Sequence, residues 1–353
     1  MLFRDENQRK RAVFWHLFLV KLSRNVYDSN RYIKGVLNSD KFILSKTITL
    51  MESSLESDMN LSIDVLRAVA KSKKTSIRIG ITGAPGVGKS TFIEAFGMYL
   101  ISLGKKVAVL AIDPSSTRTG GSILGDKTRM AELSQNKNAF IRPSPSGNSL
   151  GGVSNTTYES IVLCEAAGFD VIIVETVGVG QSEVMVKDMV DFFLLLLQPG
   201  AGDSLQGIKR GIIEMVDGLA INKCDGENKP MAKKSKLEYE NALHLFPPSE
   251  NGWSAQTITC SSLKKTGMDL IWTMILEHRS VLEKSDSLSR MRNEQRLKCF
   301  EEAINFGLNK FVFQNQNLLS SKENLQRKVS SGDMQPRDAV NQLFMKMFRD
   351  NLN

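Results

Sequence analysis

A short run with three isoleucines, at residues 77–81, leads through Thr82 into Gly83-Ala84-Pro85-Gly86-Val87-Gly88-Lys89-Ser90, which matches the pattern G-x-x-x-x-G-K-[ST]. Glycines in such a loop let backbone N–H groups converge on phosphate oxygens, and the positive end of the following helix attracts the same anion. In this pattern Lys89 reaches the β- and γ-phosphates, and the hydroxyl of Ser90 ligates Mg²⁺. The order strand, loop, helix therefore predicts a nucleotide-phosphate site whose contacts are Gly83, Ala84, Pro85, Gly86, Val87, Gly88, Lys89, Ser90 and Thr91.

Further apolar runs alternate with helical stretches at residues 107–112, 171–174, 192–197 and 219–221. Continuous apolar strands that alternate with helices are typical of a parallel sheet covered by helices on both faces. Ligands bind beyond the carboxyl ends of the strands in such a sheet. Because each run leads into polar residues of the kind that such a site needs, we predict an α/β fold with a mostly parallel sheet.

Helical patterns flank this predicted nucleotide domain on both sides. We expect an N-terminal helical segment at residues 1–70, the nucleotide domain at 71–275 and a C-terminal helical arm at 276–353. One helix face in the first segment carries Leu44, Ile48 and Met51, after the candidate caps Ser39 and Asp40. Two apolar stripes mark the arm, namely Leu297, Phe300, Ile304, Leu308 and Phe311, and then Val340, Leu343, Phe344 and Met347. These stripes fit either packing onto the nucleotide domain or a dimer interface.

The identity of the nucleotide's base is indicated by Asn222-Lys223-Cys224-Asp225, which fits the pattern N-K-x-D at the end of an apolar run. The ionised carboxylate of Asp225 can only accept hydrogen bonds. Guanine offers donors at N1 and N2 together, whereas adenine has an acceptor at N1 and no amine at N2. Losing two hydrogen bonds to a charged group, at about 1.5–3 kcal/mol each, discriminates by roughly a hundredfold or more. The predicted nucleotide is therefore GTP or GDP, and the second base-contacting loop is Ser261, Ser262 and Leu263.

A second group of residues fits the metal and the γ-phosphate. Glu175-Thr176-Val177-Gly178 follows an apolar run, so we expect Glu175 to hold Mg²⁺ through water and the N–H of Gly178 to contact the γ-phosphate. Hard oxygen ligands suit Mg²⁺, which makes Asp113 and Asp126 further candidate ligands beside Ser90. Taken alone, each aspartate fits a helix cap or a turn.

Three residues are the catalytic candidates, Lys89, Glu175 and Gln181. Val179 directly follows Gly178, where several fast GTPases place the residue that orients the attacking water, and Gln181 lies two positions further on. We therefore expect slow intrinsic hydrolysis, which a partner or a rearranged loop accelerates.

Charge and cysteine usage restrict the partners and the compartment. Of the net charge of +8, a net +5 lies within the first 35 residues, where eight Lys and Arg residues face three acidic ones. This fits a solvated basic helix or a surface for an acidic partner or an anionic membrane. The apolar run at 13–20 is too short to span a bilayer. The four cysteines form no C-x-x-C pair, as expected for reduced thiols. We expect a cytoplasmic protein that binds neither nucleic acid nor membrane.

Several longer blocks resemble one family of GTPases, the methylmalonyl-CoA mutase-associated chaperones of the MeaB/ArgK type, which includes the methylmalonic aciduria type A proteins. The resemblance runs from about Tyr32 to near the C-terminus. It is carried by residues 32–37, 48–53, 113–116, 120–130, 140–145, 175–183 and 199–211. The family implies a homodimer whose GTP state gates delivery of adenosylcobalamin to the mutase and protects that enzyme. It also implies that Pro199 to Gly211 is a mobile switch, with Lys209 a candidate partner contact.

Three other functions compete with this reading. A GTPase metallochaperone for nickel enzymes would need metal ligands, but the chain has three histidines and no paired cysteines. A regulatory kinase of basic-amino-acid transport would need a phosphoacceptor protein and a catalytic base, for which no motif is visible. A GTPase that targets nucleic acid rests only on the basic N-terminal arm. The chain contains no D-x-H-x-x-G segment, so we expect no cobalamin site of its own.

Overall fold

The computed structural model describes residues 27–53, 55–112, 130–143, 150–176, 181–200, 210–314 and 316–350. Its contacts divide the chain into two compact units. The first unit comprises residues 1–75 together with 162–168, and the second comprises residues 76–161 and 169–353. The candidate site belongs entirely to the second unit.

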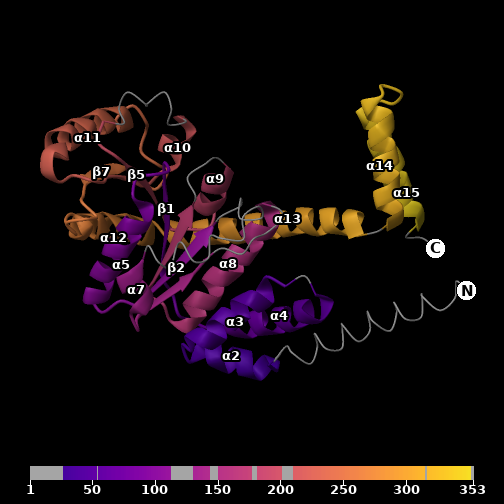
Figure 1. The fold of residues 1–353 in the computed structure, drawn as a ribbon, viewed down its shortest axis with the longest axis horizontal. Coiled ribbons are helices and arrows are strands. Elements are labelled where there is room, and N and C mark those ends of the chain that lie inside the picture. The colour runs from indigo at the N-terminus through magenta and orange to yellow at the C-terminus, as the bar shows by residue number, and fades with distance from the viewer. Residues whose placement is uncertain are drawn as a thin grey trace, which may run out of the picture. The chain divides into compact units, whose positions relative to one another are not determined.

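The second unit is built on a seven-stranded sheet in which every strand pair is parallel (Figure 1). The strand order is β3-β2-β4-β1-β5-β6-β7. The strands are β1 (Ile77–Gly83), β2 (Val107–Ile112), β3 (Ala139–Arg142), β4 (Val171–Thr176), β5 (Phe192–Leu197), β6 (Gly218–Ile221) and β7 (Gln256–Thr259). This architecture confirms the predicted α/β fold with its parallel sheet.

Strand β1 lies in the middle of the sheet, between β4 and β5. Its residue Ile81 pairs with Glu175 of β4, and Gly83 pairs with Leu196 of β5. The phosphate-binding pattern that follows β1 and the acidic residue at the end of β4 therefore emerge side by side at the carboxyl edge.

One face of the sheet is covered by α5 (Lys89–Ser102) and α12 (Met268–Lys284). Ile79 and Ile81 of β1 are fully buried there. Phe96 of α5 meets Trp272 of α12 edge to face, with 6.3 Å between ring centroids. This apolar layer fixes the position of α5, whose first residue is Lys89.

The opposite face of β1 is covered by α9 (Gln181–Lys187) and the residues that follow it. A Cβ atom on Gly80 would lie 2.7 Å from Phe193 Cδ2 and 2.8 Å from Val186 Cγ1. Real side chains essentially never approach that closely, so the missing side chain of Gly80 is what allows α9 to lie directly on the strand. The glycine in the middle of this strand thus has a packing role.

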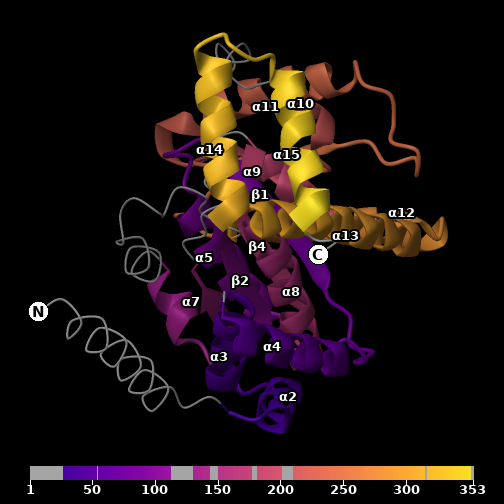
Figure 2. The same cartoon turned by 90° about the vertical axis from the view of Figure 1, so that its right-hand side faces the viewer.

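The remaining helices of the second unit connect the strands or follow the last one. They are α7 (Ala131–Gln135), α8 (Leu150–Ala167, which continues into the first unit), α10 (Arg210–Met215), η3 (Gly226–Asn228), α11 (Lys229–Leu243), α13 (Ser287–Gln314), α14 (Gln316–Ser330) and α15 (Pro336–Asp350). Helices α14 and α15 contact each other as a pair (Figure 2). Over the described residues, no helix has the length and apolarity needed to cross a membrane.

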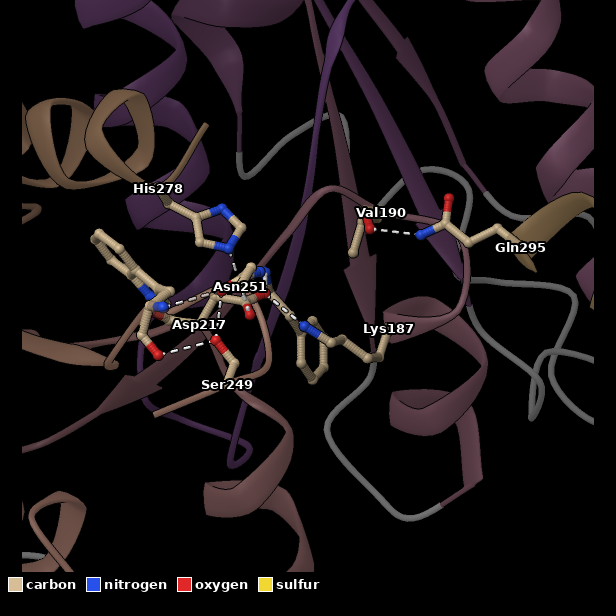
Figure 3. A network of polar contacts seen from close by, with 9 residues as sticks. Lys187, Val190, Asp217, Ser249, Asn251, His278 and Gln295 are labelled. Carbon is tan, nitrogen blue, oxygen red and sulfur yellow. Dashed lines mark hydrogen bonds and ion pairs between the residues drawn. The ribbon is translucent and has the colours of Figure 1, made fainter. Parts of the chain in front are cut away.

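Helix α13 is fixed to the amino ends of two strands by buried polar contacts. Arg292 donates to both carboxylate oxygens of Asp191, at 2.8 and 2.6 Å, and to the carbonyl oxygen of Ser76 at 2.7 Å. Gln295 Nε2 donates to the carbonyl oxygen of Val190 at 2.8 Å (Figure 3). Beyond these anchors, Leu297, Phe300, Ile304 and Leu308 are exposed, as are Val340 and Phe344 of α15.

The first unit contains α2 (Ser29–Leu37), α3 (Lys41–Met51), α4 (Glu56–Val69) and the last residues of α8. Leu44, Ile48 and Met51 are buried, as their helical spacing predicts. Asp40 caps α3 by accepting from the N–H groups of Phe42 and Ile43 at 2.9 and 3.1 Å. The other candidate cap, Ser39, has a positive φ of 63° and donates its hydroxyl to the carbonyl oxygen of Ala167 instead.

Candidate nucleotide-binding site

The loop between β1 and α5 has a backbone that requires glycine at defined points. Gly83, Gly86 and Gly88 have φ values of 153°, 81° and 96°. A Cβ on Gly83 would lie 2.5 Å from the carbonyl oxygen of Leu196, and one on Gly88 would lie 2.9 Å from Asn222 Nδ2. The loop therefore adopts a conformation that ordinary residues strain against, and it leaves backbone N–H groups available at the start of α5.

The side chain of Lys89 folds back over this loop. Its Nζ donates to the carbonyl oxygens of Gly83 at 2.7 Å and Ala84 at 3.4 Å. Burial lowers the pKa of Lys89, while attraction to the carboxylates of Glu175 and Glu183 acts in the opposite direction. A partly desolvated ammonium group above a loop of N–H donors is a strong site for phosphate oxygens.

The side-chain oxygens of Ser90 and Glu175, both candidate metal ligands, face each other. Ser90 Oγ donates to Glu175 Oε1 at 3.5 Å, and the Glu175 residue is only 8% exposed. A hydroxyl and a carboxylate are hard oxygen ligands, which fits Mg²⁺. Of the other metal and γ-phosphate candidates, Asp113, Asp126 and Gly178 lie outside the described residues, and Gln181 is described only as the first residue of α9.

Asn222 connects three segments at the carboxyl ends of β1, β6 and β7. Its Nδ2 donates to the carbonyl oxygen of Val87 at 3.0 Å. Its Oδ1 accepts from the backbone N–H of Ser262 at 3.0 Å and from the Ser262 hydroxyl at 2.7 Å. Both the NH₂ group and the oxygen of the Asn222 amide are therefore hydrogen-bonded within the protein. Through these bonds Asn222 holds the two predicted base-contacting loops together.

Lys223 and Asp225 lie on either side of the same loop. Lys223, with a positive φ of 59°, donates from Nζ to the carbonyl oxygen of Gly86 at 2.8 Å and to Gln198 Oε1 at 3.4 Å. Asp225 Oδ2 accepts a short hydrogen bond from Ser261 Oγ. The side chains predicted to read the base therefore come together, while Leu263 is 74% exposed beside them.

Two groups of polar contacts at this edge were not predicted from the sequence. Gln198 directly follows β5 and contacts Lys223, a position that its place at a strand end could have indicated. Thr82 Oγ1 donates to Glu183 Oε1 at 3.1 Å and accepts from Thr176 Oγ1 at 3.0 Å. The signal for this second group was weak, because threonine is common in strands and a glutamate is common in the first turn of a helix.

A separate polar cluster surrounds Asp217 (Figure 3), which directly precedes β6 and so lies at the opposite edge of the sheet from the phosphate loop. Asp217 Oδ2 accepts from Lys187 Nζ at 2.6 Å and from the N–H of Phe193 at 2.8 Å. His278 lies 3.8 Å from Asp217 Oδ1, and burial lowers its pKa although Asp217 favours the charged form. The rings of Phe192 and Trp253 meet His278 edge-on. This cluster is part of the packed core and contributes no group to the nucleotide edge.

The comparisons with known proteins agree on one family. The family model described as methylmalonyl Co-A mutase-associated GTPase MeaB matches residues 44–317. The GTPase ArgK of Escherichia coli is 43% identical over 311 residues, which are 88% of this chain and 94% of that protein. The methylmalonic aciduria type A homolog, mitochondrial, of Mus musculus is 41% identical over 330 residues, 91% of this chain and 79% of that protein.

A solved structure has the same architecture. The crystal structure of a LAO/AO transport system kinase superimposes with a TM-score of 0.71 at 36% sequence identity, covering 90% of this chain and 97% of that chain. The region matched by the family model contains all seven strands and every predicted site residue. The residues predicted to bind the phosphates and the base therefore lie within the region that the family model matches.

Proposed function

The chain belongs to the family of methylmalonyl-CoA mutase-associated GTPases named MeaB, and from this premise we propose that it is a GTP-hydrolysing chaperone. It would convert GTP to GDP and phosphate, and its nucleotide state would gate the loading of adenosylcobalamin into a cobalamin-dependent acyl-CoA mutase. The same cycle would protect the loaded mutase from inactivation.

One observation carries the GTPase proposal, namely that Lys89 and Asp225 belong to loops joined at one edge of one sheet. The phosphate loop is bound to the base loop through Asn222 and Lys223. Lys89 would neutralise the β- and γ-phosphates, and Asp225 would accept from N1–H and N2–H₂ of guanine. One hydrogen-bonded edge would thus recognise both ends of GTP, which is how a site selects one nucleotide.

The residues present fit Mg²⁺ as the metal that accompanies the phosphates. Ser90 and Glu175 would hold it, Glu175 through water, and Asp113 and Asp126 are the further candidate ligands. When bound, the ion neutralises phosphate charge. The protein's own contribution is to aim Lys89 and the loop N–H groups at the same oxygens.

We expect hydrolysis by the isolated protein to be slow. The only hydrolytic glutamine that the sequence offers near Gly178 is Gln181, and Val179 occupies the position directly after Gly178. Contact with a partner would complete the arrangement around the attacking water. The accelerated rate would then report that the partner is engaged.

The partner proposal rests on the family and on the segment that follows β5. The family model names methylmalonyl-CoA mutase, and the mouse relative is named for methylmalonic aciduria. Pro199 to Gly211 is the proposed switch, with Lys209 its candidate contact. Gln198, just before it, contacts Lys223, and the N–H of Gly200 donates to Ser235 Oγ at 3.2 Å. The start of the switch is thus bound to the base loop and to α11, so a change in nucleotide would reach it.

Assembly and location follow the same proposal. The exposed apolar side chains of α13 and α15 would form the interface of a homodimer. Adenosylcobalamin would be held by the mutase, and the chain would act in the cytoplasm without nucleic acid or membrane. The solved relative named as a transport system kinase keeps open a second function, phosphoryl transfer to a transport protein.

The test is GTP turnover by the purified chain, alone and with a cobalamin-dependent acyl-CoA mutase, using Lys89→Ala as the inactive control. We expect slow turnover alone and a marked, Lys89-dependent increase with the mutase. If GTP is hydrolysed but the mutase has no effect on turnover or cobalamin loading, the chaperone proposal is wrong and the GTPase remains. Transfer of the γ-phosphate to a protein, in place of its release, would favour the kinase.

A further inference from the structure

We propose that Glu183 is a positioning residue for GTP hydrolysis, which ties α9 to the end of the phosphate-loop strand through Thr82. The inference rests on the proposed GTPase function and deepens it. Glu183 would not touch the nucleotide; it would hold the groups that do.

A continuous chain of hydrogen bonds carries this proposal. Thr176 Oγ1 donates to Thr82 Oγ1 at 3.0 Å, and Thr82 Oγ1 donates to Glu183 Oε1 at 3.1 Å. Thr82 immediately precedes Gly83, the first residue of the phosphate loop, and Thr176 immediately follows Glu175. One chain of contacts therefore connects α9 with the ends of both strands that lead into the site.

These groups are buried, so each of them needs a hydrogen-bond partner within the protein. The exposed fractions are 0% for Thr82, 1% for Thr176 and 4% for Glu183. A hydroxyl has one hydrogen to donate, and Thr82 gives it to the carboxylate while accepting from Thr176. Removing either member leaves a buried polar group without its partner, which costs more than the hydrogen bond contributes. The chain of contacts therefore defines one position of α9 on β1.

A second contact fixes α9 at the same place. Gly80, two residues before Thr82, has no side chain, and Val186 Cγ1 lies only 2.8 Å from where its Cβ would be. Val186 and Glu183 are one helical turn apart on α9, so the close approach at Gly80 and the hydrogen bond at Thr82 hold the same face of α9. Gly80 and Thr82 together therefore fix how this helix packs on the strand.

Two substitutions at Glu183 separate its hydrogen bond from its charge. Glu183→Gln keeps an oxygen that accepts from Thr82 and removes the charge, whereas Glu183→Ala removes both.

The experiment measures kcat, KM for GTP and GDP affinity for Glu183→Ala, Thr82→Val, the double variant, Glu183→Gln and Thr82→Ser. We expect Glu183→Ala and Thr82→Val each to lower kcat by about tenfold, with KM and GDP affinity changed by less than about threefold. The double variant should be no slower than Thr82→Val, because Thr82→Val already removes the contact that Glu183→Ala breaks. Thr82→Ser and Glu183→Gln should recover most of the rate.

Matched surface changes, Thr273→Val and Glu277→Ala on α12, control for the loss of a hydroxyl or a carboxylate. Stoichiometric GDP binding by each variant shows that the protein is folded. Additive losses in the double variant, or a Glu183→Ala enzyme with unchanged kcat, would overturn the positioning role while the GTPase stands. If the unaltered chain releases no phosphate from GTP, the proposed function fails, and this inference fails with it.

Discussion

Asn222 Nδ2 donates a hydrogen bond of 3.0 Å to the carbonyl oxygen of Val87, 135 residues earlier in the chain. The contact joins the loop after β6 to the loop after β1. The phosphate loop and the base loop are therefore parts of one hydrogen-bonded edge. A substitution in one loop should alter the position of the other.

Asn222→Ala should therefore impair both stability and nucleotide binding. The substitution breaks contacts to Val87 and Ser262 and leaves buried partners unpaired, at about 1–3 kcal/mol for each of the two residues, so we expect about 2–6 kcal/mol less stability. Urea unfolding measures the loss, and GDP titration at a temperature where the variant is folded measures affinity. Asn309→Ala, on α13, removes an exposed amide that donates to the carbonyl oxygen of Asn305 in the same helix, and it is the matched control. Equal stability of the two variants would contradict the supporting role of Asn222.

Asp225→Asn should change which base is bound. The asparagine side chain offers a donor as well as an acceptor, so it no longer accepts from both N1–H and N2–H₂ of guanine. We expect GTP affinity to fall by roughly a hundredfold. Xanthine carries an oxygen in place of the N2 amine, so XTP should gain relative to GTP. Competition between GTP, XTP and ATP measures the preference, and an unchanged order would mean that Asp225 does not read the base.

Two glycines of the phosphate loop should respond differently to alanine. Gly83→Ala would place a Cβ 2.5 Å from the Leu196 carbonyl oxygen, whereas Gly86 has open space and only a φ of 81° to penalise alanine. We expect Gly86→Ala to lose about 1–2 kcal/mol and Gly83→Ala distinctly more. Gly307→Ala, at an exposed and open position in α13, should gain about 0.5–1 kcal/mol. Thermal unfolding of the three variants gives the order directly, and a reversed order of the two loop variants would refute this steric reading.

The sequence predicted the sheet and the two nucleotide loops because each rests on local patterns. The run at 77–81 and the pattern at 83–90 require only neighbouring residues, and the structure places Lys89 and Asn222 at the carboxyl edge that such strands share. The partners of Glu183 and Gln198 could not be predicted in the same way. Their contacts, with Thr82 and Lys223, join residues 101 and 25 positions apart. Such pairs depend on the strand order, which no local pattern specifies.

The sequence identified candidate cap and site residues more readily than the contacts that each side chain makes. Ser39 and Asp40 were both candidate caps, but only Asp40 accepts from the first N–H groups of α3. The difference lies in the backbone, because Ser39 has the positive φ that turns the chain before the helix. Asn222 likewise satisfies its amide within the protein, a use that the four-residue pattern does not reveal.

Glu159 on α8 should make stability depend on pH. Burial raises the pKa of Glu159 from 4.5 to about 7. The folded chain then binds a proton that the unfolded chain releases, so stability decreases as the pH rises from about 4.5 to about 7 and changes no further above it. Glu159→Gln should therefore add about 1–3 kcal/mol at pH 8 and little near pH 5. Denaturant unfolding of both proteins at the two pH values measures this, with Glu165→Gln as the control on the same helix. A benefit of equal size at both pH values would show that charge is not the cause.

Changing the apolar face of α13 should separate dimerisation from nucleotide binding. Phe300 and Leu297 are each 63% exposed, so they contribute little to the fold of one chain, and a partner helix would bury them. If this face forms the proposed dimer, Leu297→Lys with Phe300→Lys places like charges opposite one another and should raise the dimer dissociation constant at least a hundredfold. Light scattering across a concentration series gives the mass of the species. Because Arg292 and Gln295 fix the base of α13 before this stripe begins, GDP affinity should stay within about twofold of the unaltered chain. A charged variant that remains dimeric would place the interface elsewhere, and the apolar stripe would then need another partner.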